Sequence, residues 1–317
     1  MKSKYILFSL IFLTMTEQVF ASGAKLPDIK SEDVSVPVIG QTGAQETSPP
    51  PIPMPTPTTT PIPIPIPKEA SGAYAETING MVADSGCFKY SWGNRGRAPA
   101  GYVKGVTLSF ARSLCRLKSQ SSLSAILSAA GTQDDSKDAL THYQSVFKNL
   151  SIPVTVAGEA PLRALYTLGM GLGMRESSGK YCEGWDRSAG SSRPSSAGEA
   201  GIFQTSYDSI SASSELAKLY EEYKASPERC LLDVFKEGAS CSSLSNLGTG
   251  AGASYQAFNK SCPAFATEYA MTMLRIRRSH YGPINRKEAE VVPVCQQLLK
   301  SVQDFVNSDP YACEDLR

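Results

Sequence analysis

Apolar side chains recur at helical spacing through the last three quarters of the chain. Repeats at three and four residues predict an amphipathic helix wherever they persist. The predicted helices cover residues 102–117, 123–130, 139–150, 161–176, 216–223, 265–277 and 287–305. A long alternation of apolar and polar residues, which would predict a strand, is not found. The pattern therefore predicts a single, mainly α-helical domain over residues 71–317.

One predicted helix is unusual because three glycines interrupt it. Gly169, Gly171 and Gly173 lie within the apolar run that begins at Pro161. Each weakens a helix by roughly 1 kcal/mol relative to alanine. We expect them where another part of the backbone packs closely against this helix.

The first 21 residues follow a targeting pattern. Lys2 and Lys4 precede the apolar run 5–15, and the sequence Val19-Phe20-Ala21 offers a small-residue cleavage site. This order is typical of a secretory signal peptide. The run is shorter than the roughly 20 residues that a membrane-spanning helix needs. We expect an exported bacterial protein, secreted or periplasmic, with no membrane span after cleavage.

Residues 22–70 predict an extended connection. A polar, aperiodic stretch precedes residues 49–67, where proline recurs mostly at every second position. Proline fixes φ and lacks a donor, so polyproline II is expected there. At about 3.1 Å per residue, roughly 20 residues would span on the order of 60 Å. Composition does not decide between a stalk, a protease-resistant linker and a peptide ligand.

Cysteine content and charge restrict the chemistry. The eight cysteines are Cys87, Cys115, Cys182, Cys230, Cys241, Cys262, Cys295 and Cys313. An even number in an exported chain indicates disulfides rather than a metal site. We predict no cofactor, and Cys230–Cys241 is the one pairing that proximity suggests. The formal net charge of +1 gives no sign of nucleic-acid binding.

Residues 172–206 carry the most specific motif. They read L-G-M-R-E-S-S-G-K-Y-C-E-G-W-D, then a loop of small residues, then E-A-G-I-F-Q-T-S. This order resembles goose-type lysozymes and family-1 lytic transglycosylases, which carry E-S followed by G-[L/I/M]-[M/F]-Q. The resemblance covers about residues 161–285 and implies an α+β lysozyme-like fold with a groove. It implies that Glu176 is the catalytic acid, and that Ser177, Phe203 and Gln204 help to bind glycan.

General chemistry explains why the position of Glu176 would suit a catalytic acid. Glycosidic cleavage needs a proton donor that stays protonated near neutral pH, and burial raises the pKa of a carboxyl group. Glu176 ends an apolar helical run and is followed by a turn through Ser177, Ser178 and Gly179. A glutamate at a helix end is ordinarily a solvated surface residue. The motif that follows it is what favours the catalytic interpretation.

The loop after Glu176 supplies further candidates. Goose-type enzymes place aspartates there to hold the attacking water, which makes Asp186 the second catalytic candidate. Glu183 and Glu199 are interpreted as solvated loop residues. Tyr181 and Trp185 are candidates for stacking on sugar rings, and core packing explains them equally well.

Two further candidates follow in the second half of the chain. Asn259 lies in A-F-N-K-S, which keeps the asparagine of the transglycosylase A-Y-N-A-G motif but loses its second small pair. Tyr281 lies in a turn, H-Y-G-P-I-N, between two predicted helices. This turn either closes one end of the groove or simply connects the helices.

The resemblance therefore implies a monomeric muramidase that cleaves the MurNAc–GlcNAc β-1,4 bond of peptidoglycan. Hydrolysis would use water, whereas transglycosylation would use the N-acetyl group and 6-hydroxyl of the substrate. Carboxylates around Asp186 would suit a glucosamine ammonium, so N-deacetylated glycan is a candidate substrate. The alternative is a non-catalytic cell-wall-binding or structural protein that retains a lysozyme-like groove.

Overall fold

The computed structural model describes residues 72–131, 134–185, 192–241 and 244–316. They belong to one compact unit. The predicted signal peptide and proline-rich connection lie outside the described residues, as does Asp186.

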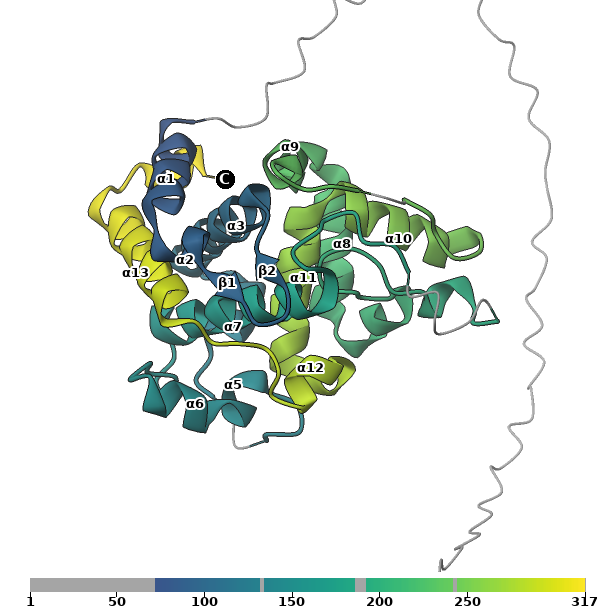
Figure 1. Cartoon of the computed structure of the whole chain (residues 1–317), viewed down its shortest axis with the longest axis horizontal. Helices are drawn as coiled ribbons and strands as arrows, with labels where there is room; N and C mark the ends of the chain where they lie inside the picture. The colour runs from purple at the N-terminus through teal and green to yellow at the C-terminus, as the bar shows by residue number, and fades with distance from the viewer. Residues whose placement is uncertain (1–71, 132–133, 186–191, 242–243, 317) are drawn as a thin grey trace, which may run out of the picture. The chain divides into compact units, whose positions relative to one another are not determined.

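The described residues are mainly helical, as the periodicity predicts (Figure 1). The first half contains α1 (Ala73–Asp84), α2 (Gly86–Lys89), β1 (Ser91–Trp92), β2 (Gly96–Arg97), α3 (Ala100–Lys118), α4 (Ser122–Ser128), α5 (Ala139–His142), α6 (Gln144–Asn149) and α7 (Glu159–Ser177). The second half contains η2 (Ser195–Ala197), η3 (Tyr207–Ala212), α8 (Ser214–Ala225), η4 (Pro227–Cys230), α9 (Leu232–Lys236), α10 (Gly250–Ser261), α11 (Pro263–Ile276), η5 (Arg278–His280), α12 (Gly282–Asn285), α13 (Pro293–Ser308) and α14 (Ala312–Asp315). The strands β1 and β2 pair antiparallel, with Ser91 opposite Arg97 and Trp92 opposite Gly96.

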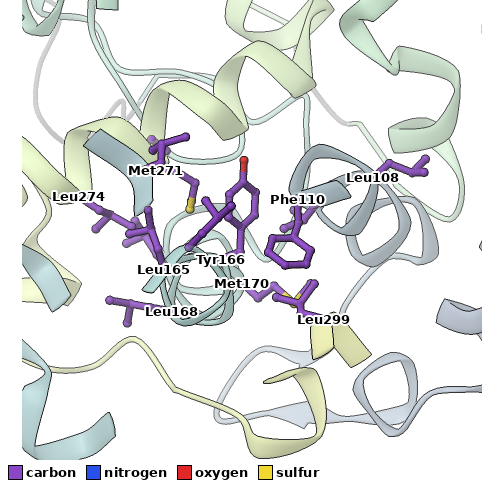
Figure 2. Close-up of a cluster of buried hydrophobic side chains, with 14 of the residues drawn as sticks. Leu108, Phe110, Leu165, Tyr166, Leu168, Met170, Met271, Leu274 and Leu299 are labelled. Atoms are coloured by element: carbon purple, nitrogen blue, oxygen red, sulfur yellow. The ribbon is translucent and has the colours of Figure 1, made fainter. Parts of the chain in front are cut away.

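Helix α7 lies at the centre of the domain. It packs against α3, α4, α11 and α13, and its residues from Pro161 to Met174 are all buried. Figure 2 shows side chains of α7, among them Leu165 and Met170, between Phe110 of α3, Met271 of α11 and Leu299 of α13. A helix that is apolar on every side is expected to be a core helix. The element that carries Glu176 is thus held on all sides.

The glycines of α7 allow the close packing that the sequence predicts. A Cβ atom at Gly171 would lie 2.1 Å from the backbone carbonyl oxygen of Glu290, so only glycine fits there. The helix ends at Ser177, and Ser178 and Gly179 both adopt left-handed backbone conformations. The Gly179 N–H donates to the carbonyl oxygen of Gly173 at 3.1 Å. This left-handed ending fixes the last turn of α7.

Several predicted boundaries need correction. The segment 139–150 divides into α5 and α6 at Tyr143, and α13 begins at Pro293 rather than at residue 287. Proline is well accommodated in a first helical turn, which explains the later start. Helices α1 and α10 were not among the predicted helices.

All eight cysteines form disulfides, but the predicted Cys230–Cys241 pair is wrong. The bridges are Cys87–Cys295, Cys115–Cys313, Cys182–Cys241 and Cys230–Cys262. Cys230 ends η4 and meets the junction of α10 and α11, whereas Cys241 follows α9 and meets the loop after α7. Proximity in sequence was therefore a poor guide to pairing.

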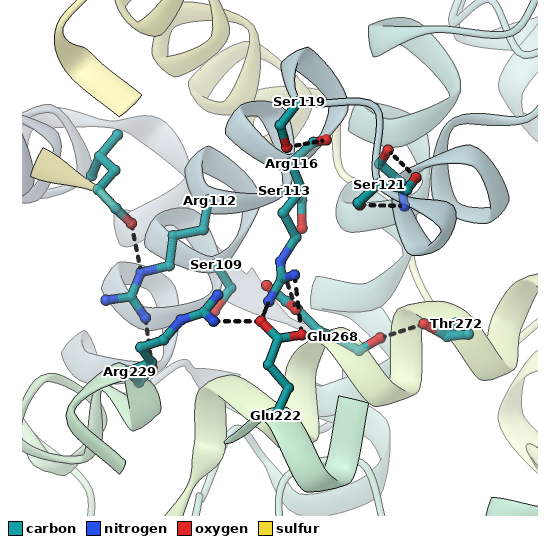
Figure 3. A network of polar contacts seen from close by, with 12 residues as sticks. Ser109, Arg112, Ser113, Arg116, Ser119, Ser121, Glu222, Arg229, Glu268 and Thr272 are labelled. Carbon is teal, nitrogen blue, oxygen red and sulfur yellow. Dashed lines mark hydrogen bonds and ion pairs between the residues drawn. The ribbon is translucent and has the colours of Figure 1, made fainter. Parts of the chain in front are cut away.

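A cluster of charged side chains joins α3, α8, η4 and α11 (Figure 3). Glu268 is fully buried, and its Oε2 lies 3.4 Å from the Nε of Arg116. Arg116 also pairs with Glu222 at 2.7 Å, and Glu222 in turn pairs with Arg229.

Among the described residues, no helix is both long enough and apolar enough to cross a membrane.

Candidate active site

Glu176 lies in the last turn of α7 and is partly buried. Burial first, and then the negative charge of Glu199, raise the pKa of its carboxyl group from 4.5 to about 7. The positive charges of Arg286, Arg95 and Arg175 act in the opposite direction. The balance favours a carboxyl group that remains protonated to a substantial extent at neutral pH.

The three arginines do not neutralise Glu176, because much of their charge is engaged elsewhere. Glu288 accepts from Nη2 of Arg175 at 3.0 Å and from Nε of Arg286 at 2.8 Å. These two arginines lower the pKa of Glu288 to about 2. Arg95, on the turn between β1 and β2, donates through Nη2 to the carbonyl oxygen of Arg175 at 2.5 Å. These contacts occupy the arginines, and the pKa of Glu176 stays raised despite their positive charges.

The turn at residues 201–204 is tied to the loop that follows Glu176. The Gly201 N–H donates to the carbonyl oxygen of Glu183 at 2.9 Å, and Ala200 pairs with Thr205 across the turn. Gly201 has φ 78° and Gln204 has φ 46°. A left-handed conformation is uncommon for a residue other than glycine, and such residues cluster at functional sites. The Gln204 side chain closes the turn by donating to the carbonyl oxygen of Gly201 at 2.9 Å.

His280 and Tyr281 approach the turn from the segment between α11 and α12. His280 Nε2 lies 3.3 Å from the carbonyl oxygen of Gln204 and 3.9 Å from Oε1 of Glu199. Tyr281 is 1% exposed, and its hydroxyl has no hydrogen-bond partner among the described residues. Burial raises the pKa of Tyr281, and the charges of Glu176 and Glu199 add to this effect. The two carboxylates and this phenol therefore share one electrostatic environment.

Five of the predicted ligand-contacting residues are buried, namely Ser177, Phe203, Gln204, Asn259 and Tyr281. The Ser177 hydroxyl donates to the carbonyl oxygen of Gly173 at 3.1 Å, and Phe203 is 1% exposed. Asn259 is fully buried and donates through Nδ2 to Oγ1 of Thr205 at 2.7 Å. Their side chains present little surface to a sugar, and their contact with glycan stays a prediction. They hold the end of α7 and the turn in place.

The aromatic candidates divide between core and loop. Tyr181 is partly buried and packs against the core, which favours the packing interpretation. Trp185 is partly buried at the last described position before Asp186, which lies outside the described residues. Trp185 therefore remains the aromatic candidate for stacking on a sugar ring.

Glu199, interpreted from the sequence as a solvated loop residue, has a side chain that is 36% exposed, and its charge also acts on Glu176 and Tyr281. A carboxylate directly before A-G-I-F-Q is the signal that could have identified this effect. Its neighbour His280 is distant in sequence, so periodicity gave no hint of their contact.

Within the described residues, no group of three or more His, Cys, Asp or Glu side chains could hold a metal ion. No protein-family model, curated protein or solved structure matches the chain. The functional argument therefore depends on the geometry and electrostatics of the site itself and on the two short motifs.

Proposed function

We propose that this protein is a muramidase that cleaves the β-1,4 bond between MurNAc and GlcNAc in peptidoglycan. Glu176 is its general acid. The observation that carries the proposal is the carboxyl of Glu176, whose pKa of about 7 arises at the end of a buried helix. The E-S-S-G and G-I-F-Q motifs, which resemble those of lysozyme-like enzymes, support it independently.

The local geometry suits acid catalysis. A donor is most effective when its pKa lies close to the operating pH, because the proton is then both present and transferable. Transfer of the Glu176 proton to the glycosidic oxygen accompanies cleavage of the C1–O4 bond. The rigid α7 fixes the position of the donor, which is the arrangement that efficient catalysis requires.

Other features support action outside the cell. Four disulfides require an oxidising environment to form and persist. The signal-peptide pattern at residues 1–21 and the proline-rich connection at 22–70 fit a catalytic domain held at a distance from its point of attachment or release. Peptidoglycan is the polymer that such a protein would meet there.

The test compares wild type, Glu176→Gln and the control Glu76→Gln, which changes an exposed glutamate on α1. Each purified protein is incubated with native and with N-deacetylated peptidoglycan, and the soluble products are identified by mass spectrometry. We expect muropeptides from wild type and from the control, and none from Glu176→Gln. The substrate that yields products reports the preferred acetylation state.

Two results would change the assignment. Products from Glu176→Gln at the wild-type rate would remove Glu176 as the acid. Absence of products from wild type on both substrates, with all three proteins still sedimenting with the cell wall, would replace the enzyme by a wall-binding protein.

A further inference from the structure

We propose that Arg95 is a positioning residue of the proposed muramidase. From the turn between β1 and β2 it holds the last turn of α7, and with it the carboxyl group of Glu176, in the place that proton transfer requires. This inference rests on the proposed function and adds a residue that lies outside both sequence motifs.

The end of α7 needs hydrogen-bond donors from outside the helix. The last four carbonyl groups of a helix have no partner within it. Backbone N–H groups of the turn that follows donate to the carbonyl oxygens of Met174 and Ser177. The carbonyl oxygen of Arg175, directly before Glu176, instead accepts from Nη2 of Arg95 at 2.5 Å. A positive side chain is also favourable at the C-terminus of a helix, so Arg95 caps the turn that carries the acid.

The turn that carries Arg95 has a well-defined backbone. Trp92 pairs with Gly96 across the hairpin, and the Arg95 N–H donates to the carbonyl oxygen of Trp92 at 3.0 Å. Asn94 and Gly96 both adopt left-handed conformations, which asparagine and glycine tolerate well. Trp92 is 3% exposed, so its ring anchors the hairpin in the core. Arg95 therefore reaches α7 from a fixed position.

Glu290 ties the same hairpin to α7. Its Oε1 accepts from the Gly93 N–H at 2.8 Å, and its Oε2 accepts from the Tyr90 hydroxyl at 2.9 Å. The backbone of Glu290 packs against Gly171, where an added Cβ would lie 2.1 Å from the Glu290 carbonyl oxygen. One residue thus holds the hairpin and contacts the helix whose end Arg95 caps.

Arg95 also contributes to the electrostatic environment of the acid. Burial is the largest cause of the raised pKa of Glu176, and the nearby charges are those of Glu199, Arg286, Arg95 and Arg175. Arg95 donates to a neutral carbonyl oxygen, and its positive charge lowers the pKa of Glu176. Its removal should therefore raise that pKa and move the alkaline limb of the kcat profile to higher pH. A residue that only stabilised the fold would leave this limb in place.

The test uses the full mature protein and the substrate that gives products with wild type. Arg95→Met removes the donor and the charge, whereas Arg95→Lys keeps a charge and a donor. Arg97→Met is the matched control, because it changes an exposed arginine on the same hairpin. Circular dichroism checks that all three variants are folded.

We expect kcat to fall about 10- to 100-fold in Arg95→Met with KM nearly unchanged, because a small displacement of a catalytic group has an effect of this size. The alkaline limb should move to higher pH in this variant alone. Arg95→Lys should recover most of the kcat, and Arg97→Met should behave as wild type does.

Two further measurements check the physical cause. A carbon-NMR titration of the Glu176 carboxyl should give a higher pKa in Arg95→Met than in wild type, and no change in Arg97→Met. Glu290→Ala releases the hairpin, so adding Arg95→Met to that variant should lower kcat much less than it does in wild type, as expected for coupled residues.

Failure of this inference differs from failure of the proposed function. Wild-type kcat in Arg95→Met, an alkaline limb that does not move, or an equal loss in Arg97→Met would overturn the role of Arg95 while muropeptides still form. A higher KM with unchanged kcat would also overturn it, since Arg95 would then bind substrate rather than position the acid. Absence of any product from wild type would instead contradict the proposed function, even with the NMR shift present.

Discussion

Replacing Glu176 by glutamine should stabilise the protein, and should do so only at neutral and alkaline pH. The pKa of Glu176 rises from 4.5 to about 7 on folding, so the folded state binds the proton more tightly than the unfolded state does. Between these pH values the unfolded state has fewer bound protons, and the free energy of unfolding therefore falls as pH rises. Below the lower value, where both states are protonated, the charge has no effect.

The magnitude follows from the shift. Each pKa unit corresponds to 1.36 kcal/mol, so a rise from 4.5 to about 7 corresponds to about 3 kcal/mol. Wild type loses that amount between pH 4 and pH 8, whereas the glutamine variant has no charge to bury. Urea titrations at pH 4, 6 and 8 with disulfides intact should show a difference near zero at pH 4, rising to about 3 kcal/mol in favour of the variant at pH 8.

Glu288→Gln is the control because its expected sign is opposite. Arg286 and Arg175 lower the pKa of Glu288 to about 2, so its charge stabilises the fold above pH 4.5 and that contribution disappears toward pH 2. The glutamine variant of Glu288 should therefore be less stable than wild type at pH 8. An equal gain in stability at pH 4 and pH 8 for Glu176→Gln, or a loss at pH 8, would refute the proposed environment of the acid.

Three further predictions concern the fold. Gly171→Ala places a Cβ 2.1 Å from a backbone carbonyl oxygen and should lower the free energy of unfolding in urea by at least about 1–3 kcal/mol. The control is Gly80→Ala in α1, where the added Cβ contacts no other atom, and it should raise the free energy of unfolding by up to about 1 kcal/mol. Arg116→Met leaves the buried Glu268 without its arginine and should lower the free energy of unfolding by about 3–5 kcal/mol. Adding Glu268→Leu should recover most of that loss. An equal loss in the single and the double variant would contradict the pairing. Mild reduction followed by alkylation and peptide mapping should label the Cys182–Cys241 bridge first, because its second cysteine is exposed whereas the cysteines of the other bridges are buried.

Periodicity predicted the helices whose apolar faces enter the core. Helices α3, α7, α8 and α11 lie close to their predicted ranges, because burial of regularly spaced apolar residues is what forms them. Helix α10 was missed because it begins G-A-G-A-S, a run of small residues with little apolar signal. Its helical state is stabilised by tertiary contacts with η2 and α11, which no local pattern reports.

The candidate site was predictable only where chemistry and neighbouring sequence coincide. Glu176 and the 201–204 turn lie within one continuous motif, so the sequence could place them together. Glu199 and His280 come from two segments that are distant in the sequence and approach each other only in the folded protein. The same holds for the disulfides Cys182–Cys241 and Cys230–Cys262. Contacts between segments that are distant in the sequence, which no local pattern reports, bring these residues together.

Two of the disulfides connect the beginning of the domain to its end. Cys87 pairs with Cys295 and Cys115 with Cys313, at sequence separations of 208 and 198. For a chain exported N-terminus first, as the signal-peptide pattern predicts, the first cysteine of each pair must wait until the chain over a separation of 208 or 198 residues has followed it out. Cys115 on α3 and Cys295 on α13 belong to helices that pack against α7, so under the proposed function the surroundings of Glu176 would be completed only after export, in an oxidising compartment.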